Sequence, residues 1–324
     1  MAIQTSIIIT SCNNFETTTG PCLKSLLKDK ERDDFEIIVV DNASLDNTTE
    51  KVRELAAGEE NVRLVINNSN RGFAGGNNDG AKIARGNILI LLNSDTIVPQ
   101  GTIGKLTRLL FEHPEWGMLG PVSNQAGNEQ KILTRSENQD EIIREGEEWC
   151  ARSKGDYFRS ERLDFFCVAI RKVVFDRLRG FDERFGLGYY EDVDYSIRAN
   201  LEGIIMIFTE DCFVYHSAGK TFSKMGREGV KRLMHENKRA LKKKYSGAVK
   251  LFHMRDMNLN IMKQYLLIKW AGDAGRINDL DYKFNNRLSL ANTIYPHNPF
   301  KKLLYFYNLK RLCSSYLRYD NQTG

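Results

Sequence analysis

The segment from Asn87 to Val98 has the sequence NILILLNSDTIV, in which five consecutive apolar residues are followed by the polar triplet Asn93-Ser94-Asp95. A short apolar run that is closed by turn-forming residues is typical of a central strand in a parallel sheet. Ligands of such sheets bind just beyond the carboxyl ends of the strands. We therefore expect Asp95 to stand at a ligand site, although Asp also favours these positions as a turn or helix-capping residue.

Apolar strand-like segments alternate with amphipathic helical segments through the first 125 residues, and this alternation resumes at residue 164. It is typical of βαβ units, and it predicts an α/β fold with a Rossmann-like, mainly parallel sheet flanked by helices. The predicted strands are residues 6–10, 35–40, 62–67, 88–92, 164–171, 204–208 and 212–215. The predicted helices are residues 17–29, 48–57, 77–84, 106–112, 172–179, 191–201 and most of the chain beyond 227.

Residues 120–162 are polar and show no period, which predicts long surface loops of the kind that contact a variable substrate. Charge divides the chain, because residues 220–324 carry 22 Lys or Arg against 7 Asp or Glu, whereas residues 1–219 carry 25 against 35. We therefore expect a catalytic domain over residues 1–245 and a basic helical C-terminal extension over residues 246–324.

Composition narrows the class of protein. The chain has 324 residues with 41% hydrophobic and 27% charged residues, as expected of a globular protein with a sizeable core. Its six cysteines are scattered without a CxxC pair, so the pattern favours neither a zinc site nor a disulfide framework. We find neither a signal peptide nor an apolar run of roughly 18 residues that would span a membrane. A cytoplasmic location is expected.

Polar residues recur where predicted strands end, at Asp41-Asn42, at Asn93-Ser94-Asp95 and at His216. These ends can face one cleft, where Asp95 and His216, together with diphosphate oxygens, would bind a divalent cation. Carboxylate and phosphate oxygens suit Mg²⁺ or Mn²⁺, and an imidazole shifts the choice towards Mn²⁺. The alternative for His216 is a hydrogen-bonded histidine at a strand end without a metal.

The segment NRGFAGGNNDG, residues 70–80, is rich in glycine and leads into a helix, so its backbone can closely approach a phosphate or a sugar. It is not a P-loop, because no Lys-Ser or Lys-Thr follows the glycines. A tight turn that caps a helix is the structural alternative. Asp41 could instead hold the ribose of a nicotinamide cofactor, but the first strand is followed by SCNNF and not by GxGxxG, which disfavours a dehydrogenase.

The segment FDERFGLGYYEDVDYSIR, residues 181–198, places Glu191, Asp192 and Asp194 beside two tyrosines at the start of a predicted helix. Helical spacing turns Asp192 and Asp194 to different faces, so we do not expect them to act as a pair. Acids at a helix N-terminus are also favoured by the helix dipole alone. One acid near a cleft can serve as a general base if it reaches an acceptor hydroxyl.

Taken in order, these motifs resemble the inverting nucleotide-sugar glycosyltransferases with the GT-A fold, glycosyltransferase family two, and in particular their rhamnosyl- and galactofuranosyl-transferase-like branch. The resemblance spans roughly residues 5–245. It rests on five segments: TSIIITSCNN (5–14), EIIVVDNASLDNT (36–48), NRGFAGGNNDGAKIARGNILILLNSDT (70–96), GFDERFGLGYYEDVDYSIRANLEG (180–203) and VYHSAGKT (214–221).

The resemblance implies a role for each matching residue. Asp95 takes the position of the metal-binding acid of the family's DxD motif, and His216 matches a histidine that helps to hold the metal or the diphosphate. Asp192 matches the catalytic base, with Glu191 beside it in the ED motif. The residues implied to bind the nucleotide sugar are Thr10, Ser11, Asp41, Asn42, Asn70, Arg71, Gly72, Gly75, Gly76, Asn93 and Ser94.

The implied reaction moves a sugar from a UDP- or dTDP-sugar to a hydroxyl of a glycan, lipid-linked or protein-linked acceptor, in surface polysaccharide or glycoconjugate assembly. The alternative outside catalysis is a degenerate transferase that binds glycans or acts as a scaffold. The basic C-terminal third can lie on the inner, anionic face of a membrane, or pack on the catalytic domain or a second subunit with its lysines in water. Charge alone would allow nucleic-acid binding, but no recognised motif supports it.

Overall fold

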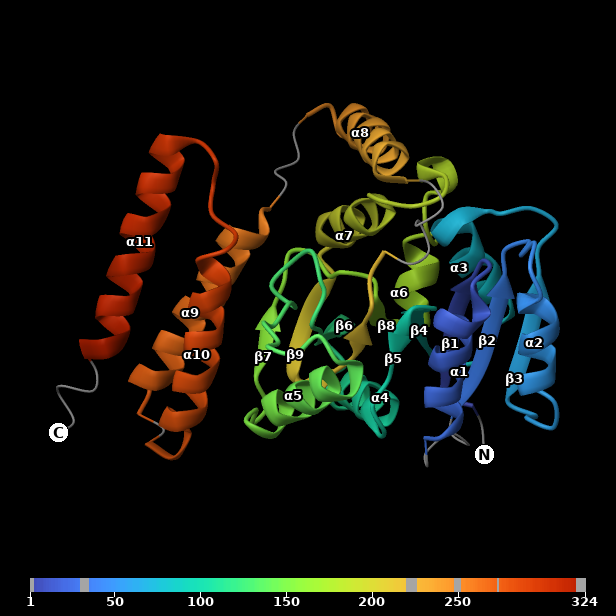
Figure 1. The fold of residues 1–324 in the computed structure, drawn as a ribbon, viewed down its shortest axis with the longest axis horizontal. Helices are drawn as coiled ribbons and strands as arrows, with labels where there is room; N and C mark the ends of the chain where they lie inside the picture. Colours follow the sequence, from blue (N-terminus) through green and yellow to red (C-terminus); the bar gives the residue numbers. More distant parts are fainter. Residues whose placement is uncertain (1–2, 30–34, 220–225, 248–251, 273, 319–324) are drawn as a thin grey trace.

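The computed structural model describes residues 3–29, 35–219, 226–247, 252–272 and 274–318, and its centre is an eight-stranded sheet (Figure 1). The strand order is β3-β2-β1-β4-β8-β6-β9-β7. The strands are β1 Thr5–Ser11, β2 Phe35–Asp41, β3 Val62–Ile66, β4 Ile88–Asn93, β6 Trp116–Val122, β7 Tyr157–Arg159, β8 Cys167–Arg171 and β9 Ile205–Phe213. A separate two-stranded ladder pairs β5 (Thr96–Ile97) with β10 (Tyr215–His216).

The sheet is mainly parallel, as the sequence predicts. Strands β1, β2, β3 and β4 run parallel to one another, and β6 and β9 form a second parallel pair. Strand β8 is antiparallel to both β4 and β6, and β7 is antiparallel to β9 at the edge. The carboxyl ends of β1, β2 and β4 therefore meet at one edge of the sheet, where the sequence predicts the ligand site.

Alternate residues of the strands face two separate hydrophobic cores. Ile7 and Ile9 of β1 belong to the core beneath the helices on one face, whereas Ile8 between them belongs to the core on the other face. The first face carries α1 (Thr19–Leu27), α2 (Thr48–Leu55) and α4 (Thr102–Glu112). The second face carries α3 (Gly72–Ile83), α5 (Gln139–Ala151), α6 (Lys172–Arg177) and α7 (Glu191–Leu201).

The prediction of long surface loops over residues 120–162 is wrong, because this stretch contains the end of β6, helix α5 and strand β7. The Asn138 side chain accepts hydrogen bonds from the backbone N–H groups of the first turn of α5. Ile142 and Trp149 then form its buried face. The two residues are seven positions apart, a helical spacing of two turns, but acids surround them and conceal the period in the composition.

Two other boundaries differ from the prediction. Helix α3 starts at Gly72, so the glycine-rich segment is already helical rather than a turn that leads into a helix at residue 77. Strand β9 runs without a break over Ile205–Phe213, where two short strands were expected, because the buried polar residues Thr209 and Glu210 continue the strand. The last two residues of the motif at 214–221 lie outside the described residues.

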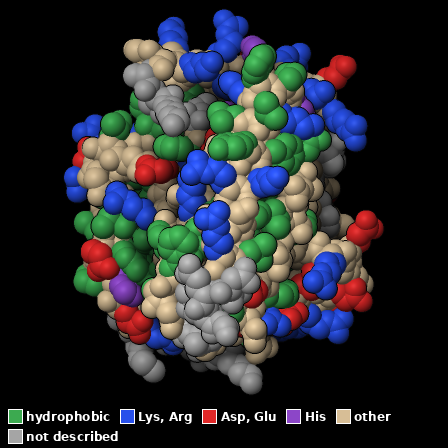
Figure 2. All heavy atoms as spheres, turned by 90° about the vertical axis from the view of Figure 1, so that its left-hand side faces the viewer, with side chains coloured by type: hydrophobic (Ala, Val, Ile, Leu, Met, Phe, Trp, Pro, Cys, Tyr) green, Lys and Arg blue, Asp and Glu red, His purple; other side chains and the backbone are tan. Residues whose placement is uncertain are grey.

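The C-terminal third is helical, as expected, and consists of α8 (Gly226–Lys244), α9 (Met254–Trp270), α10 (Ile277–Ala291) and α11 (Pro299–Arg318). Helix α8 lies over α7, whereas α9, α10 and α11 stand beside the β7 edge of the sheet (Figure 1). Figure 2 views this side and shows Lys and Arg side chains interspersed with hydrophobic ones. Among the described residues no helix combines the length and the apolar character needed to cross a membrane.

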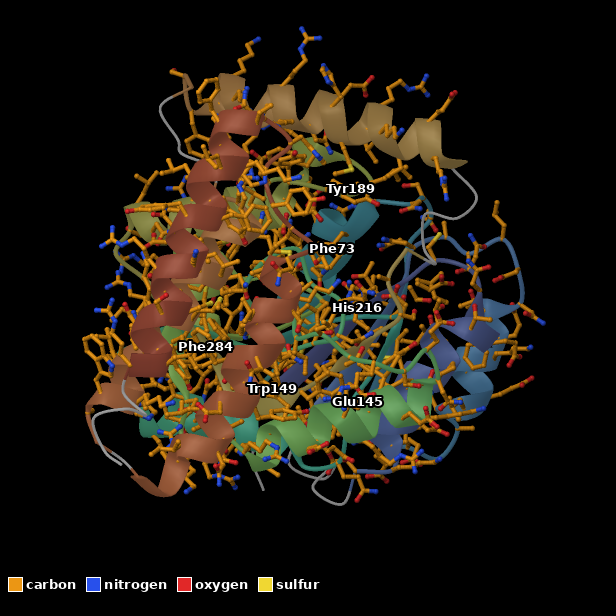
Figure 3. All side chains as sticks on the ribbon, turned by 60° about the vertical axis from the view of Figure 1, so that its left-hand side comes forward. Phe73, Glu145, Trp149, Tyr189, His216 and Phe284 are labelled. Atoms are coloured by element: carbon orange, nitrogen blue, oxygen red, sulfur yellow. The ribbon has the colours of Figure 1, made fainter. Side chains whose placement is uncertain are left out.

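These helices do not simply keep their basic residues in water. Lys283 and Arg287 of α10 are fully buried, and both form ion pairs with Glu210 of β9, at 3.0 and 2.9 Å. Lys283 also contacts Asp156 at 2.7 Å, and Tyr265 of α9 donates a hydrogen bond to Glu210. The C-terminal helices and the sheet therefore share one core, in which Figure 3 shows Trp149 and Phe284.

Candidate active site

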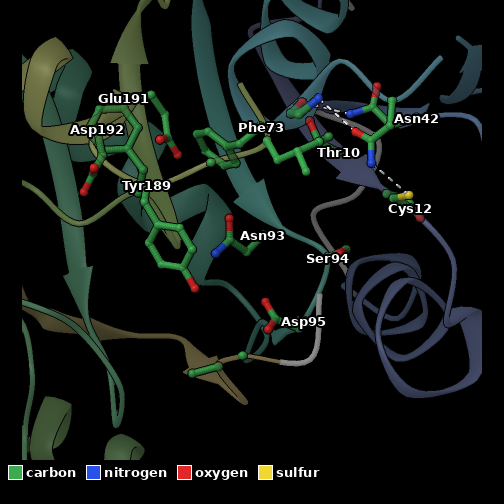
Figure 4. A pocket seen from close by; sticks show the side chains of 18 of the residues that line it. Thr10, Cys12, Asn42, Phe73, Asn93, Ser94, Asp95, Tyr189, Glu191 and Asp192 are labelled. Carbon is green, nitrogen blue, oxygen red and sulfur yellow. Dashed lines mark hydrogen bonds between the residues drawn. The ribbon is translucent and has the colours of Figure 1, made fainter. Parts of the chain in front are cut away.

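A cavity of about 660 Å³ opens at the carboxyl ends of β1, β2 and β4 (Figure 4). Its other wall comes from the segment before α7 and from β10. Eleven of the predicted site residues line it: Thr10, Ser11, Asn42, Asn70, Gly72, Asn93, Ser94, Asp95, Glu191, Asp192 and His216. Positions up to 206 residues apart in the sequence thus meet in one place because the strands end at a common edge.

Asp95 and His216 form a carboxylate–imidazole pair on one wall of this cavity. The β5–β10 ladder pairs His216 with Thr96, and the Asp95 Oδ1 atom lies 3.3 Å from the His216 Nε2 atom. The other ring nitrogen, Nδ1, lies 3.0 Å from the backbone carbonyl of Gln125. Burial lowers the pKa of His216, but the hydrogen bond and charge of Asp95 outweigh burial and raise the pKa overall.

This pair has the donor chemistry of a divalent cation site. With Nδ1–H donating to this carbonyl, loss of the Nε2 proton would free the Nε2 lone pair to bind a cation shared with Asp95, and metal-ligating histidines are commonly oriented by such a second hydrogen bond. In the described ranges there is no cluster of three or more His, Cys, Asp or Glu that could hold a metal. Mg²⁺ and Mn²⁺ sites often take only one or two protein ligands and complete their shell with substrate phosphates and water.

The side of the cavity formed by β1 and β2 is lined by short polar residues. Asn42 donates a hydrogen bond of 2.8 Å to the carbonyl of Gly72, and Asn70 accepts one of 2.9 Å from the Gly72 backbone N–H. The hydroxyl of Thr10 is buried and has no hydrogen-bond partner within the described structure. Gly72 has a φ of 67°, and a Cβ there would lie 2.1 Å from the Gly186 carbonyl oxygen, so only glycine allows this approach.

Four predicted donor-site residues do not line the cavity. Asp41 is buried and accepts hydrogen bonds from Ser44 and Thr49, so it shapes the turn after β2. Arg71 forms ion pairs with Asp79 and Glu183. Gly75 and Gly76 lie in α3, and Gly76 allows the helix to pack closely on β1, since a Cβ there would lie 2.5 Å from the Thr10 Cγ2 atom.

The acidic wall is formed by the first residues of α7. Tyr189 and Tyr190 precede the helix in left-handed backbone conformations, with φ values of 70° and 76°. Such values are strained for bulky residues and indicate a loop held by its surroundings. Figure 4 shows Glu191 and Asp192 at a different wall of the cavity from Asp95, with Asn93 between them. Asp194 points elsewhere and pairs with Arg198 and Lys244, so the predicted separation of Asp192 and Asp194 is confirmed.

Both members of the acidic pair favour the protonated state more than an exposed acid does. Burial raises the pKa of Glu191, and the charge of Asp192 raises it further. Burial also raises the pKa of Asp192, while the Arg162 guanidinium opposes this and the Asp164 carboxylate adds to it. The Glu191 Oε2 atom is buried without a hydrogen-bond partner in the described structure. Perturbed carboxyl groups of this kind are typical of acid–base sites.

Several residues of the site are not predicted from the sequence. Phe73, Asp164, Phe165 and Leu187 line the cavity. Phe73 and Leu187 lie inside recognised motifs, which could have indicated them, whereas Asp164 and Phe165 lie outside every motif. Asn237 of α8 lies outside the cavity but is buried, and its side-chain amide donates to the carbonyls of Phe185, Gly188 and Tyr189 at 2.7, 2.8 and 3.0 Å. No sequence signal marks an asparagine in a basic helix as the residue that holds this loop.

Comparison with known proteins identifies the family. The family model described as Glycosyl transferase family 2 matches residues 6–177, which is just over half of the chain. The chain therefore belongs to glycosyl transferase family 2. An uncharacterized glycosyltransferase of Bacillus subtilis (strain 168), YfnE, is 33% identical over 103 residues, which cover 32% of this chain and 26% of that protein. The aligned region thus spans about a quarter of that relative.

Solved structures of similar fold support the architecture. The mannosyltransferase PcManGT from Pyrobaculum calidifontis, in complex with GDP-Man and Mn²⁺, superposes with a TM-score of 0.52 at 16% identity, over 97% of this chain and 74% of that one. TarS 1-349 of S. aureus in complex with UDP-GlcNAc gives a TM-score of 0.51 at 16% identity, over 98% and 83%. The predicted GT-A-like fold with a helical C-terminal region is confirmed.

Proposed function

We propose that the chain transfers a sugar from a nucleoside-diphosphate sugar to an acceptor hydroxyl with inversion at the anomeric carbon. The observation that carries this proposal is the joining of Asp95, His216 and Asp192 in one cavity beside Thr10, Asn42 and Asn70. The motifs resemble those of rhamnosyl- and galactofuranosyl-transferases, so UDP- and dTDP-linked donors are the first to test.

The two walls of the cavity take different parts in the proposed reaction. Asp95 and His216 would hold Mn²⁺ or Mg²⁺, which neutralises charge on the departing diphosphate. The similar mannosyltransferase structure contains Mn²⁺ with its donor, which supports a metal at this pair. Thr10, Asn42 and Asn70 would contact the nucleoside.

Asp192 would be the general base. The acceptor oxygen forms its bond to the anomeric carbon while the bond from that carbon to the phosphate oxygen breaks, and the leaving diphosphate takes the electron pair. The acceptor proton passes to the Asp192 carboxylate. Burial and the charge of Asp192 raise the pKa of Glu191, so Glu191 would stay protonated while Asp192 carries the negative charge of the pair.

A donor panel tests this function. We would measure binding and slow hydrolysis of UDP-, dTDP- and GDP-sugars by the full chain with Mn²⁺, with Mg²⁺ and with EDTA. Metal-dependent use of one donor supports the proposal. Failure of a folded protein to bind any of them would favour the degenerate, glycan-binding alternative.

We also propose that the chain works on the inner face of an anionic membrane, in assembly of a surface polysaccharide or glycoconjugate. Helix α11 supports this, because its face opposite the packed residues Tyr305 and Leu309 exposes apolar side chains. Their exposed fractions are 86% for Phe300, 73% for Leu303, 60% for Leu304 and 58% for Tyr307. The helix has five Lys or Arg and no acid, a composition suited to an anionic bilayer surface.

Vesicle binding tests the membrane contact. Phe300→Ser with Leu304→Ser should reduce co-sedimentation with phosphatidylglycerol vesicles by at least tenfold, because each side chain loses apolar burial worth about 1–2 kcal/mol. The control is Val173→Ser with Leu201→Ser, a pair of exposed apolar residues on other helices. Equal binding by both double variants would contradict a contact through α11.

A further inference from the structure

A second, smaller cavity of about 240 Å³ lies beside the acidic wall. Its lining comes from the segment at residues 161–162, from α7, from α8 and from the start of α9. Three basic or imidazole side chains contribute to it, namely Arg162, Lys238 and His253. Lys238 and His253 have no role in the mechanism described above, and Arg162 enters it only through its charge near Asp192.

The two cavities adjoin each other near the residue proposed as the general base. Tyr190, which lines the smaller cavity, immediately precedes Glu191 and Asp192, which line the larger one. The Arg162 guanidinium acts electrostatically on Asp192 and on Tyr190, opposing the rise in pKa that burial causes in each, and Asp164, two residues on, lines the larger cavity. The smaller cavity therefore lies at the acidic wall, on the acceptor side of the proposed base and not at the Asp95–His216 pair that would hold the donor diphosphate.

Cations outnumber acids around this cavity. Lys238 is exposed and forms no ion pair within the ranges described. Arg162 is half-buried and forms none there either; its guanidinium donates to the Gly127 carbonyl, and its Nε atom is buried without a hydrogen-bond partner. Besides burial, the charges of Arg255, Lys238 and Lys301 lower the pKa of His253. The acids nearby are Glu161, which also lines the cavity, and Asp256, which acts on His253.

We infer that this cavity binds a phosphate group of the acceptor, so that a phosphate-bearing acceptor places its hydroxyl at Asp192. Arg and Lys side chains are the usual partners of phosphate oxygens, and an unpaired cationic cavity next to the base gives such an acceptor both charge complementarity and orientation. This inference rests on the proposed function for its orientation towards Asp192, whereas phosphate binding itself can be measured without any transfer.

Direct titration tests the site. Inorganic phosphate and glucose 1-phosphate are titrated into the full chain by calorimetry, with EDTA present so that no cation holds an anion at Asp95. Lys238→Glu should weaken binding at least tenfold, and His253→Gln, which preserves size and hydrogen bonding, several-fold. The control Lys243→Glu makes the same charge change on an exposed part of α8 and should alter the affinity less than twofold.

The outcomes separate the possibilities. No binding at millimolar phosphate, or equal weakening by Lys238→Glu and Lys243→Glu, overturns the inference, because the second result indicates only the general charge of α8. If His253→Gln and Lys238→Glu both bind like the unaltered chain, the inference also fails. Phosphate binding that depends on Lys238, in a protein that uses no donor, would uphold this site and refute the proposed function.

A second comparison identifies the source of the phosphate. Phosphatidylcholine vesicles with and without phosphatidic acid present a phosphate monoester on a lipid, and glucose 1-phosphate presents one in solution. If Lys238→Glu reduces binding to the phosphatidic acid vesicles and glucose 1-phosphate competes with them, the phosphate belongs to a lipid-linked acceptor. If glucose 1-phosphate binds and the vesicles do not require Lys238, the acceptor is a soluble phosphorylated glycan.

Discussion

The two functional walls of the main cavity are built by different means. Asp95 and His216 stand on backbone ladders, since β4 ends next to Asp95 and the β5–β10 pairing sets His216 opposite Thr96. Asp192 instead follows two strained tyrosines in a loop that the Asn237 side chain of α8 holds by its carbonyls. Ladders fix a position through many backbone hydrogen bonds, whereas this loop depends on the Asn237 amide and on a backbone hydrogen bond from Phe73 to Leu187, so it can shift more easily. The acidic wall is therefore the more adjustable of the two.

The largest expected effect is on the acidic wall. Asp192→Asn keeps the shape of the side chain but removes the base, so we expect transfer to fall on the order of a thousandfold. Donor affinity should stay within about twofold, because the opposite wall is untouched. Single-turnover transfer and donor calorimetry measure the two quantities, with the exposed Asp176→Asn as control. Parallel loss of transfer and donor binding would remove Asp192 from the role of base.

A change on the ladder wall should have the reverse signature. Asp95→Ala removes the carboxylate from the proposed cation pair, so donor affinity in Mn²⁺ should fall on the order of a hundredfold. The affinity that remains should not respond to EDTA. Calorimetry with and without chelator checks this, with Glu112→Ala on the surface of α4 as the matched loss of an acid. A variant that still gains affinity from Mn²⁺ would exclude Asp95 as the principal ligand.

Asn237→Ala tests whether the acidic wall is held from outside. It frees three carbonyls of the loop, so we expect a loss of stability of about 1–3 kcal/mol and a roughly tenfold fall in kcat/KM for the acceptor. Donor affinity should not change, whereas a general structural defect would weaken donor binding as well. Chemical denaturation, acceptor kinetics and donor calorimetry measure these, and Lys243→Ala on the exposed side of α8 is the control. An equal fall in donor affinity and in kcat/KM for the acceptor would argue against selective positioning.

The smallest effect is a displacement of the pH profile. Asp192 must be ionised to act as base and its pKa is raised, so activity should fall as pH drops through a midpoint above the roughly 3.9 of an exposed aspartate. Arg162→Gln removes a cation that favours the carboxylate and should move the acid limb to higher pH. Asp164→Asn removes a neighbouring anion and should move it to lower pH. If the pH profiles of kcat/KM for the two variants shift in the same direction, or do not shift, the acid limb does not report the ionisation of Asp192.

The same contrast explains what the sequence could predict. Asp95 was predictable because twelve consecutive residues contain both the apolar strand and the carboxylate that follows it. The parallel sheet was predictable because strand-like and helical segments alternate along the chain. Helix α5 was missed because glutamates surround its buried residues, Ile142 and Trp149. The position of Asn237 was not predictable, since its partners lie about fifty residues earlier in the chain.

The roles at the acidic wall and the metal pair stay predictions, although the structure brings most of their residues into one cavity. Motif matching predicted four residues that do not line the cavity: Asp41, Arg71, Gly75 and Gly76. Such a residue can belong to a motif because it shapes the local backbone and packing, and not because it faces the ligand. The burial of Lys283 and Arg287 depends on Asp156 and Glu210, which lie far away in the sequence.

That buried cluster bears on how such a chain can change over evolutionary time. A charge that loses its partner inside a protein costs several kcal/mol, so Glu210 and Asp156 cannot lose Lys283 and Arg287 without compensating changes. Helices α9 and α10 are therefore not exchangeable parts that recombination could swap among related catalytic sheets. A lineage that replaced the C-terminal helices would have needed either new cations opposite Glu210 and Asp156 or neutral residues in their place.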